Sequence, residues 1–271
     1  MNSFIMAHKR KKSESSGGSG PLVPDLVSLG ILTKQVSEFT SDDIGKVEVS
    51  IPYSNEGSAI SGPIIFEVVG VNHHTSAAHP KTITLMTKNI IRTAYFDREE
   101  LRNPNSDRVN GNNRWKHSNI RQWLNSAGAA NSWFTAQHEY DTAPTYASEP
   151  GFLAGFSKDV LQHFTTITNT TAVPNVDGGG SETTEDKVFL PSWTELLGSP
   201  NYDIEEGSHL SVRYPDNNSI IKKWYGSSYY YWLRSPVADT SYYTIIIDGV
   251  GEKYSDYVYR EYGIAPIIVL H

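Results

Sequence analysis

The chain has 271 residues, no cysteine and a net charge of −7, with 38% hydrophobic, 20% charged and 11% aromatic residues. These values indicate a folded chain with a substantial core, and they exclude disulfides, cysteine-ligated metal sites and thiol nucleophiles. Residues 1–20 hold four of the 23 Lys and Arg but one of the 30 Asp and Glu, so the remainder is more acidic still and a poor nucleic-acid surface.

Residues 1–24 are predicted to form a flexible tethering tail. A basic run over residues 8–12 precedes a Ser/Gly-rich stretch over residues 13–20 and two prolines, Pro21 and Pro24. The basic run indicates either an arm that docks on nucleic acid or on a partner, or a solvated tail, which is favoured. No signal peptide is expected, because only Phe4, Ile5 and Met6 form an apolar group and they precede the basic run. No apolar stretch is long enough to span a membrane.

The first predicted elements of the body, residues 25–271, are two strands. Residues 63–71 form a β-branched run and residues 82–87 alternate between apolar and polar, so a hairpin is expected around residues 73–81. This loop contains His73, His74 and His79, but no metal-binding spacing occurs, and neighbouring histidines on a strand would face opposite sides. No metal site is therefore expected.

Three short helices follow, each with a capping signal. Ser118 or Asn119 can cap residues 120–125, Ser157 can cap residues 158–164, and residues 192–195 form a capping box. The segments 97–117 and 137–151 are predicted to be long ordered loops, which are typical of binding proteins. Toward the end of the chain four more strands are predicted, over residues 228–233, 242–247, 257–259 and 264–270. The predicted class is α+β with β dominant.

Sequence motifs for catalysis are absent. There is no G-x-S-x-G elbow, Walker A motif or dinucleotide fingerprint, and no carboxylate pair stands out for glycoside cleavage. The acidic residues 177–186 lack the residue order of a calcium loop, so a plain acidic loop is favoured, with calcium as the alternative. No cofactor is expected.

Tyrosine is unevenly distributed: 12 of the 16 tyrosines lie between residues 202 and 271. Tyrosine provides a rigid contact surface that is apolar on its faces and polar at its tip, and binding surfaces use it often. The tyrosines either form a recognition face or merely cover a sheet with their hydroxyls in water.

Particular segments resemble the family called domain of unknown function 6273. They are residues 118–126 (SNIRQWLNS), residues 186–195 (DKVFLPSWTE) and residues 231–236 (YWLRSP), in that order, within a similarity over about residues 40–271. The closing G-x-R-P motif of the family is represented by residues 263–267, where Ala265 replaces the usual arginine.

The resemblance implies a C-type-lectin-like fold, similar to that of formylglycine-generating enzymes and phage receptor-binding proteins. In such folds the motif residues support the scaffold. In this sequence the corresponding residues are Arg121, Trp123, Trp232 and Arg234. The segment between the motifs, residues 237–262, would display the side chains that contact ligand. The residues predicted to contact ligand are Tyr242, Tyr243, Asp256, Tyr257, Tyr259 and Arg260.

The leading hypothesis is a non-enzymatic phage virion protein on the virion surface, whose domain binds a bacterial surface ligand, a glycan. Its tail would join other virion proteins, and a homo-oligomer is left open. One alternative is a capsid or tail decoration protein that binds no host ligand. Another is a carbohydrate-active enzyme, although the cysteine-dependent chemistry of the formylglycine-generating enzymes is excluded.

Overall fold

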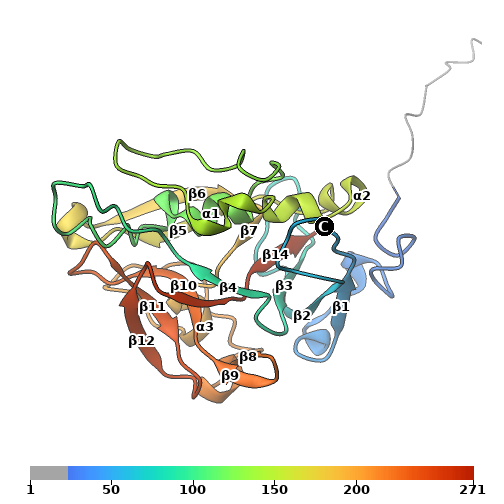
Figure 1. Ribbon diagram of the computed structural model, residues 1–271. Helices are drawn as coiled ribbons and strands as arrows, with labels where there is room; N and C mark the ends of the chain where they lie inside the picture. Colours follow the sequence, from blue (N-terminus) through green and yellow to red (C-terminus); the bar gives the residue numbers. More distant parts are fainter. Residues whose placement is uncertain (1–23) are drawn as a thin grey trace, which may run out of the picture.

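The computed structural model describes residues 24–271 (Figure 1), and the predicted tail, apart from Pro24, lies outside these residues. Within them the chain forms two five-stranded sheets, two smaller strand pairs and three short α-helices. This arrangement confirms the α+β class with β dominant. No helix in this part of the chain has the length and apolar character needed to cross a membrane.

The first sheet joins the two ends of the described chain. Its order is β1 (Glu48–Ile51), β2 (Ile64–Val71), β3 (Ile83–Thr87), β14 (Ile267–Leu270) and β7 (Val188–Phe189). All neighbouring strands are antiparallel, and β1 is an edge strand. The β-branched run predicted to form a buried strand forms β2, in which every residue is buried or partly buried.

The second sheet contains most of the C-terminal strands. Its order is β12 (Lys253–Tyr257), β11 (Tyr243–Ile247), β10 (Tyr231–Pro236), β13 (Glu261–Ile264) and β4 (Arg92–Tyr95). Only the β10–β13 pair is parallel among these neighbours. Because β12 is an edge strand, the β11–β12 hairpin presents one side to solvent.

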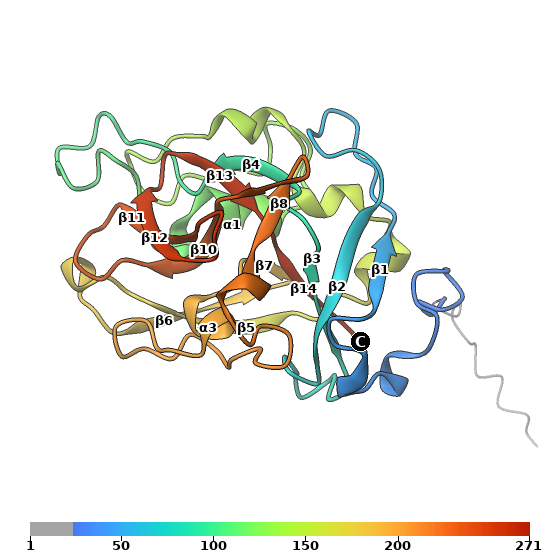
Figure 2. The ribbon, with the colours of Figure 1, turned by 90° about the horizontal axis from the view of Figure 1, so that it is seen from below.

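The remaining elements are short. The two strand pairs are β5 (Ile167–Ala172) with β6 (Ser181–Asp186) and β8 (Lys222–Trp224) with β9 (Ser227–Tyr229). The α-helices are α1 (Asn119–Leu124), α2 (Lys158–Leu161) and α3 (Trp193–Leu197). The 3₁₀ turns are η1 (Val36–Glu38), η2 (Ser41–Asp43), η3 (Trp115–His117), η4 (Thr145–Ser148), η5 (Phe152–Gly155), η6 (Asn175–Asp177) and η7 (Asn217–Ile220). Figure 2 shows the two large sheets side by side, seen at 90° to the first view.

The predicted helix starts are confirmed. Ser118 accepts a hydrogen bond from the Arg121 amide, Ser157 accepts one from Val160, and Ser192 forms a reciprocal capping box with Glu195. Helix α2 ends at Leu161 and not at residue 164. The reason is that Phe164 leaves the helix to form a β-bridge with Leu270.

Several predicted strands are divided or shifted. The segment 264–270 is interrupted at Pro266, which lacks the amide donor a ladder needs, and the segment 228–233 splits between β9 and β10. Strand β12 ends at Tyr257, and residues 258–260 turn, with the Arg260 amide donating to the Tyr257 carbonyl.

Two further expectations were wrong. Part of the predicted acidic loop is strand β6, and strands β1, β4 and β5 were not predicted. The rings of His73 and His74 do not face opposite sides but contact each other at 4.7 Å between centroids. Strand β2 ends before them, at Val71, because Asn72 adopts a left-handed backbone with φ of 52°.

A continuous hydrophobic core extends from Leu26 to Leu270. Trp115, Trp123 and Trp232 are fully buried within it. The core therefore joins both large sheets and the helices of the described chain.

Candidate functional site

Four tyrosines of the β11–β12 hairpin and the turn after it form a continuous group of rings, called here the tyrosine cluster: Tyr242, Tyr243, Tyr257 and Tyr259. Antiparallel pairing places Tyr243 directly opposite Tyr257, with 4.5 Å between ring centroids. Tyr242 stacks on Tyr257 at 5.5 Å with an interplanar angle of 10°, and Tyr259 lies 5.1 Å from Tyr257. All four side chains keep partial contact with solvent.

Arg260 and Asp256 adjoin the cluster in different ways. The guanidinium carbon of Arg260, an exposed residue, lies 5.3 Å from the Tyr259 ring centroid. The carboxylate of Asp256 accepts hydrogen bonds from the Tyr257 amide at 2.7 Å and the Tyr262 hydroxyl at 2.5 Å. The six predicted contact residues are thus brought together, but Asp256 already has partners for both oxygens.

Hydrogen bonding and burial raise the pKa of two tyrosines in this region, Tyr243 and Tyr262. Hydrogen bonding to the Tyr257 side chain raises the pKa of Tyr243 to about 12. Burial and the bond to the Asp256 carboxylate raise the pKa of Tyr262. Tyr243 and Tyr262 therefore keep neutral phenol groups, which can both donate and accept hydrogen bonds, at physiological pH.

A long loop holds the base of the cluster. The Asn113 side-chain amide donates to the Thr240 carbonyl at 2.8 Å and the Tyr243 carbonyl at 2.7 Å, and its backbone amide donates to Ser241. In Figure 1 and Figure 2 the loop over residues 97–114 lies on the same side of the molecule as β11 and β12. The predicted long ordered loop therefore holds the backbone of the segment that carries Tyr242 and Tyr243.

The same loop lines a polar cavity of about 240 Å³. Its walls include Asn112, Arg114, His117, Gln137 and His138. Asn112, in the cavity wall, is the sequence neighbour of Asn113, which holds the backbone of the tyrosine cluster. Amide, imidazole and guanidinium groups can bind hydroxyl groups of a ligand through hydrogen bonds.

Three arginines of the segment 108–121 tie this loop to the acidic residues 177–186. The ion pairs are Arg108–Asp177, Arg114–Glu182 and Arg121–Asp186. Three of the four carboxylates of the predicted acidic loop are therefore already paired with cations, and the fourth, Glu185, is exposed. Among residues 24–271, no group of three or more His, Asp or Glu side chains is arranged to hold a metal ion.

Asp186 is the centre of the network that holds Arg121. This carboxylate is almost completely buried and accepts from Arg121 Nε at 2.7 Å and Trp115 Nε1 at 3.0 Å. It also accepts from Asn169 Nδ2 at 3.1 Å and Thr184 Oγ1 at 2.6 Å. These contacts fasten α1 and η3 to the β5–β6 pair.

Arg234 is buried and forms a bidentate ion pair with Glu195. Its Nη1 and Nη2 atoms lie 2.7 and 2.8 Å from the two carboxylate oxygens, and they also donate to the carbonyls of Leu190 and Glu206. Burial alone would raise the pKa of Glu195, but the Arg234 charge and the hydrogen bond from His74 hold it well below its usual value. The pair joins β10 to α3.

Trp123 and Trp232 each combine a buried ring with a satisfied donor. Trp123 Nε1 donates to the Pro150 carbonyl at 3.0 Å, and Trp232 Nε1 donates to the Ala94 carbonyl at 2.8 Å. With Arg121 and Arg234, they contact backbone and buried carboxylates, whereas the tyrosine cluster lies at the surface.

Two exposed aromatic side chains near the cluster were not selected from the sequence. Tyr254 on β12 is 57% exposed and Tyr230 is 38% exposed. In addition, Lys253 lies 4.6 Å from the Trp193 ring centroid. The Tyr-rich composition of the segment was the available signal, but only the strand register shows which tyrosines face outward.

Acid should weaken the fold through His271. Burial, together with His79, His163 and Lys187, lowers the pKa of His271 from 6.5 to about 4. The unfolded chain therefore binds more protons between pH 6.5 and 4, and stability falls as the pH is lowered through this range. Because His271 is partly exposed, we expect a loss on the order of 1 kcal/mol.

Melting temperatures measured from pH 7.5 to 5 test this prediction. The decline in melting temperature should be smaller for His271→Asn than for the native protein. An unchanged slope in the variant would show that His271 does not contribute. His73 and His117 also have lowered pKa values, mainly through burial, so part of the slope should remain.

The family model described as Domain of unknown function (DUF6273) matches residues 81–271. The chain belongs to this family, as the three sequence segments indicated, although the matched range begins later than the expected residue 40. No curated protein and no solved structure matches the chain.

Proposed function

We propose that this member of the DUF6273 family is a non-enzymatic adhesion protein on a phage particle, and that its tyrosine cluster binds a glycan on a bacterial surface. The observation that carries the binding part is the row of four partly exposed tyrosine rings, 4.5 to 5.5 Å apart between neighbouring centroids. The phage setting and a C-type-lectin-like fold rest on the sequence resemblance. One antiparallel and one mixed sheet, with long ordered loops and few helices, are compatible with such a fold.

The chemistry of the cluster fits a sugar. Aromatic faces cover the apolar faces of pyranose rings, while phenol hydroxyls and nearby amides form hydrogen bonds with ring hydroxyls. Tyrosine loses little conformational entropy on binding because it has two rotatable side-chain bonds. The loop that holds the cluster through Asn113 also lines a cavity with polar side chains, including Asn112 and Arg114.

Within the cluster the residues have different roles. Tyr257 and Tyr259 provide ring surface, and Arg260 can pair with an anionic substituent of the ligand. Asp256 positions Tyr257 and Tyr262, since both its oxygens accept hydrogen bonds from them. We therefore assign Asp256 a positioning role.

Binding to a panel of bacterial surface glycans tests the proposal. Tyr257→Ala and Tyr259→Ala should each weaken the affinity for a bound glycan at least about tenfold, because central aromatic residues dominate binding energies. Tyr225→Ala is the matched control, because Tyr225 is 90% exposed on the separate β8–β9 hairpin. Affinities equal to that of the native protein in both cluster variants would contradict the proposal.

A further inference from the structure

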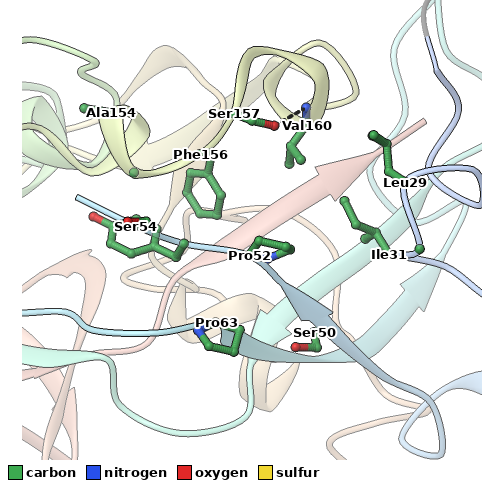
Figure 3. Close-up of a pocket in the computed structure, with 13 residues that line it drawn as sticks. Leu29, Ile31, Ser50, Pro52, Ser54, Pro63, Ala154, Phe156, Ser157 and Val160 are labelled. Carbon is green, nitrogen blue, oxygen red and sulfur yellow. Dashed lines mark hydrogen bonds between the residues drawn. The ribbon is translucent and has the colours of Figure 1, made fainter.

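A second, larger cavity lies on the other large sheet, beside edge strand β1. Its volume is about 810 Å³ (Figure 3). The side chains that line it are mainly apolar and include Leu29, Ile31, Pro52, Pro63, Phe156 and Val160. They come from four stretches of the chain, residues 29–31, 50–54, 63 and 154–160, and face a common space, with Ser50, Ser54 and Ser157 also in the lining.

This cavity has the character of a binding site. Its volume lies within the range of about 300–1,000 Å³ typical of ligand sites, and such sites are mostly apolar with a few polar groups. Apolar surface left in contact with water is unfavourable, so an apolar occupant would be stabilised there.

The chain itself contains a segment with matching chemistry. Phe4, Ile5 and Met6 are three consecutive large apolar residues in a part of the sequence that is otherwise polar as far as residue 20. Seventeen residues separate Met6 from Pro24, and such a length can span at most about 60 Å. Leu29 in the cavity wall is only five residues after Pro24, so the segment is covalently linked close to the cavity.

Charge also favours this segment. The basic residues Lys9, Arg10, Lys11 and Lys12 follow Met6 closely. Among the residues that the structure describes, no charged residue lines the cavity, but the exposed carboxylates Glu56 and Asp159 lie within two residues of the lining residues Ser54 and Val160. These carboxylates are available to pair with cations that follow an apolar group in the cavity.

We propose that Phe4, Ile5 and Met6 dock in this cavity of their own chain, with the basic run placed near Glu56 and Asp159. The linkage makes docking intramolecular, which raises the local concentration of the segment at the cavity. The cavity would then be a contact site for the N-terminal segment on the domain itself, independent of glycan binding at the tyrosine cluster.

Disulfide trapping tests this proposal without competing thiols, because the native chain has no cysteine. The test protein carries Ile5→Cys and Ser50→Cys, since Ser50 is exposed on β1 at the cavity. The matched control carries Ile5→Cys and Ser228→Cys, since Ser228 is exposed on β9. Both are oxidised with diamide at low protein concentration, and free thiols and molecular mass are followed with time.

The expected result is an intramolecular disulfide that forms at least about tenfold faster in the Ser50 protein than in the Ser228 control. Adding Phe4→Asp should reduce the rate in the Ser50 protein to that of the control, while the melting temperature stays the same. Equal rates at the two sites would overturn the proposal. Disulfide-linked dimers as the main product would also overturn it, by assigning the cavity to the segment of a second copy.

Discussion

Replacing Arg234 with methionine should lower the free energy of unfolding by about 3–5 kcal/mol, because it leaves a buried carboxylate without its cation. Glu195 is fully buried, and Arg234 supplies hydrogen bonds to both of its oxygens. After the substitution only His74 and the helix-capping amide of Ser192 remain as partners. The Leu190 carbonyl loses its side-chain donor as well, whereas the Glu206 carbonyl keeps the Ser192 hydroxyl as a donor.

Urea denaturation monitored by tryptophan fluorescence measures this loss. Arg260→Met is the matched control, because the exposed Arg260 should change stability by less than about 0.5 kcal/mol. A double variant with Arg234→Met and Glu195→Gln should recover part of the loss, because the uncompensated charge is removed. If Arg234→Met were as stable as the control, the ion pair would not be a structural clamp.

Replacing Asp186 with alanine should destabilise the protein by about 3–5 kcal/mol, through loss of the acceptor for several buried donors. Trp115 Nε1 and Asn169 Nδ2 would be left without this partner, and Arg121 would lose its ion pair. Each unsatisfied buried donor costs about 1–3 kcal/mol. The loss should also loosen the attachment of α1 to the β5–β6 pair.

Glu185→Ala provides the control, because Glu185 is the exposed neighbour of Asp186 on β6. Thermal unfolding should show a large decrease in melting temperature for Asp186→Ala and a small one for Glu185→Ala. Similar decreases would mean that the hydrogen bonds of Asp186 contribute no more to stability than the exposed side chain of Glu185 does.

The sequence predicted local structure best where one residue type has one physical role. The caps Ser118, Ser157 and Ser192 placed all three helices, because a side-chain acceptor at that position satisfies free helix amides. The β-branched run of β2 likewise predicted a strand correctly. These signals act within a few residues and need no knowledge of the rest of the fold.

Long-range partners were not predictable. Residues 181–186 have the composition of a solvated loop, yet they form a strand because β5 pairs with them and two arginines form ion pairs with Glu182 and Asp186. The short strand β4 is defined by its pairing with β13, more than 160 residues later. Tertiary pairing outweighs local propensity in both cases.

The candidate site, like the fold, was predictable only where the signal was local. The excess of tyrosine after residue 202 indicated a region, but the stacking of Tyr242 on Tyr257 depends on the β11–β12 register. The role of Asp256 in holding Tyr262 could not be read from spacing alone. Composition thus located the surface, and the register defined its members.

The central claim is that the tyrosine cluster is a contact surface and that the buried arginines and tryptophans are its scaffold. The most direct test compares adsorption to bacterial cells with melting temperature in one set of variants. The Tyr257→Ala, Tyr259→Ala double variant should lose adsorption at least about tenfold while its melting temperature falls by only a few degrees. Native adsorption in the double variant, or loss of adsorption only in proportion to unfolding, would contradict the claim.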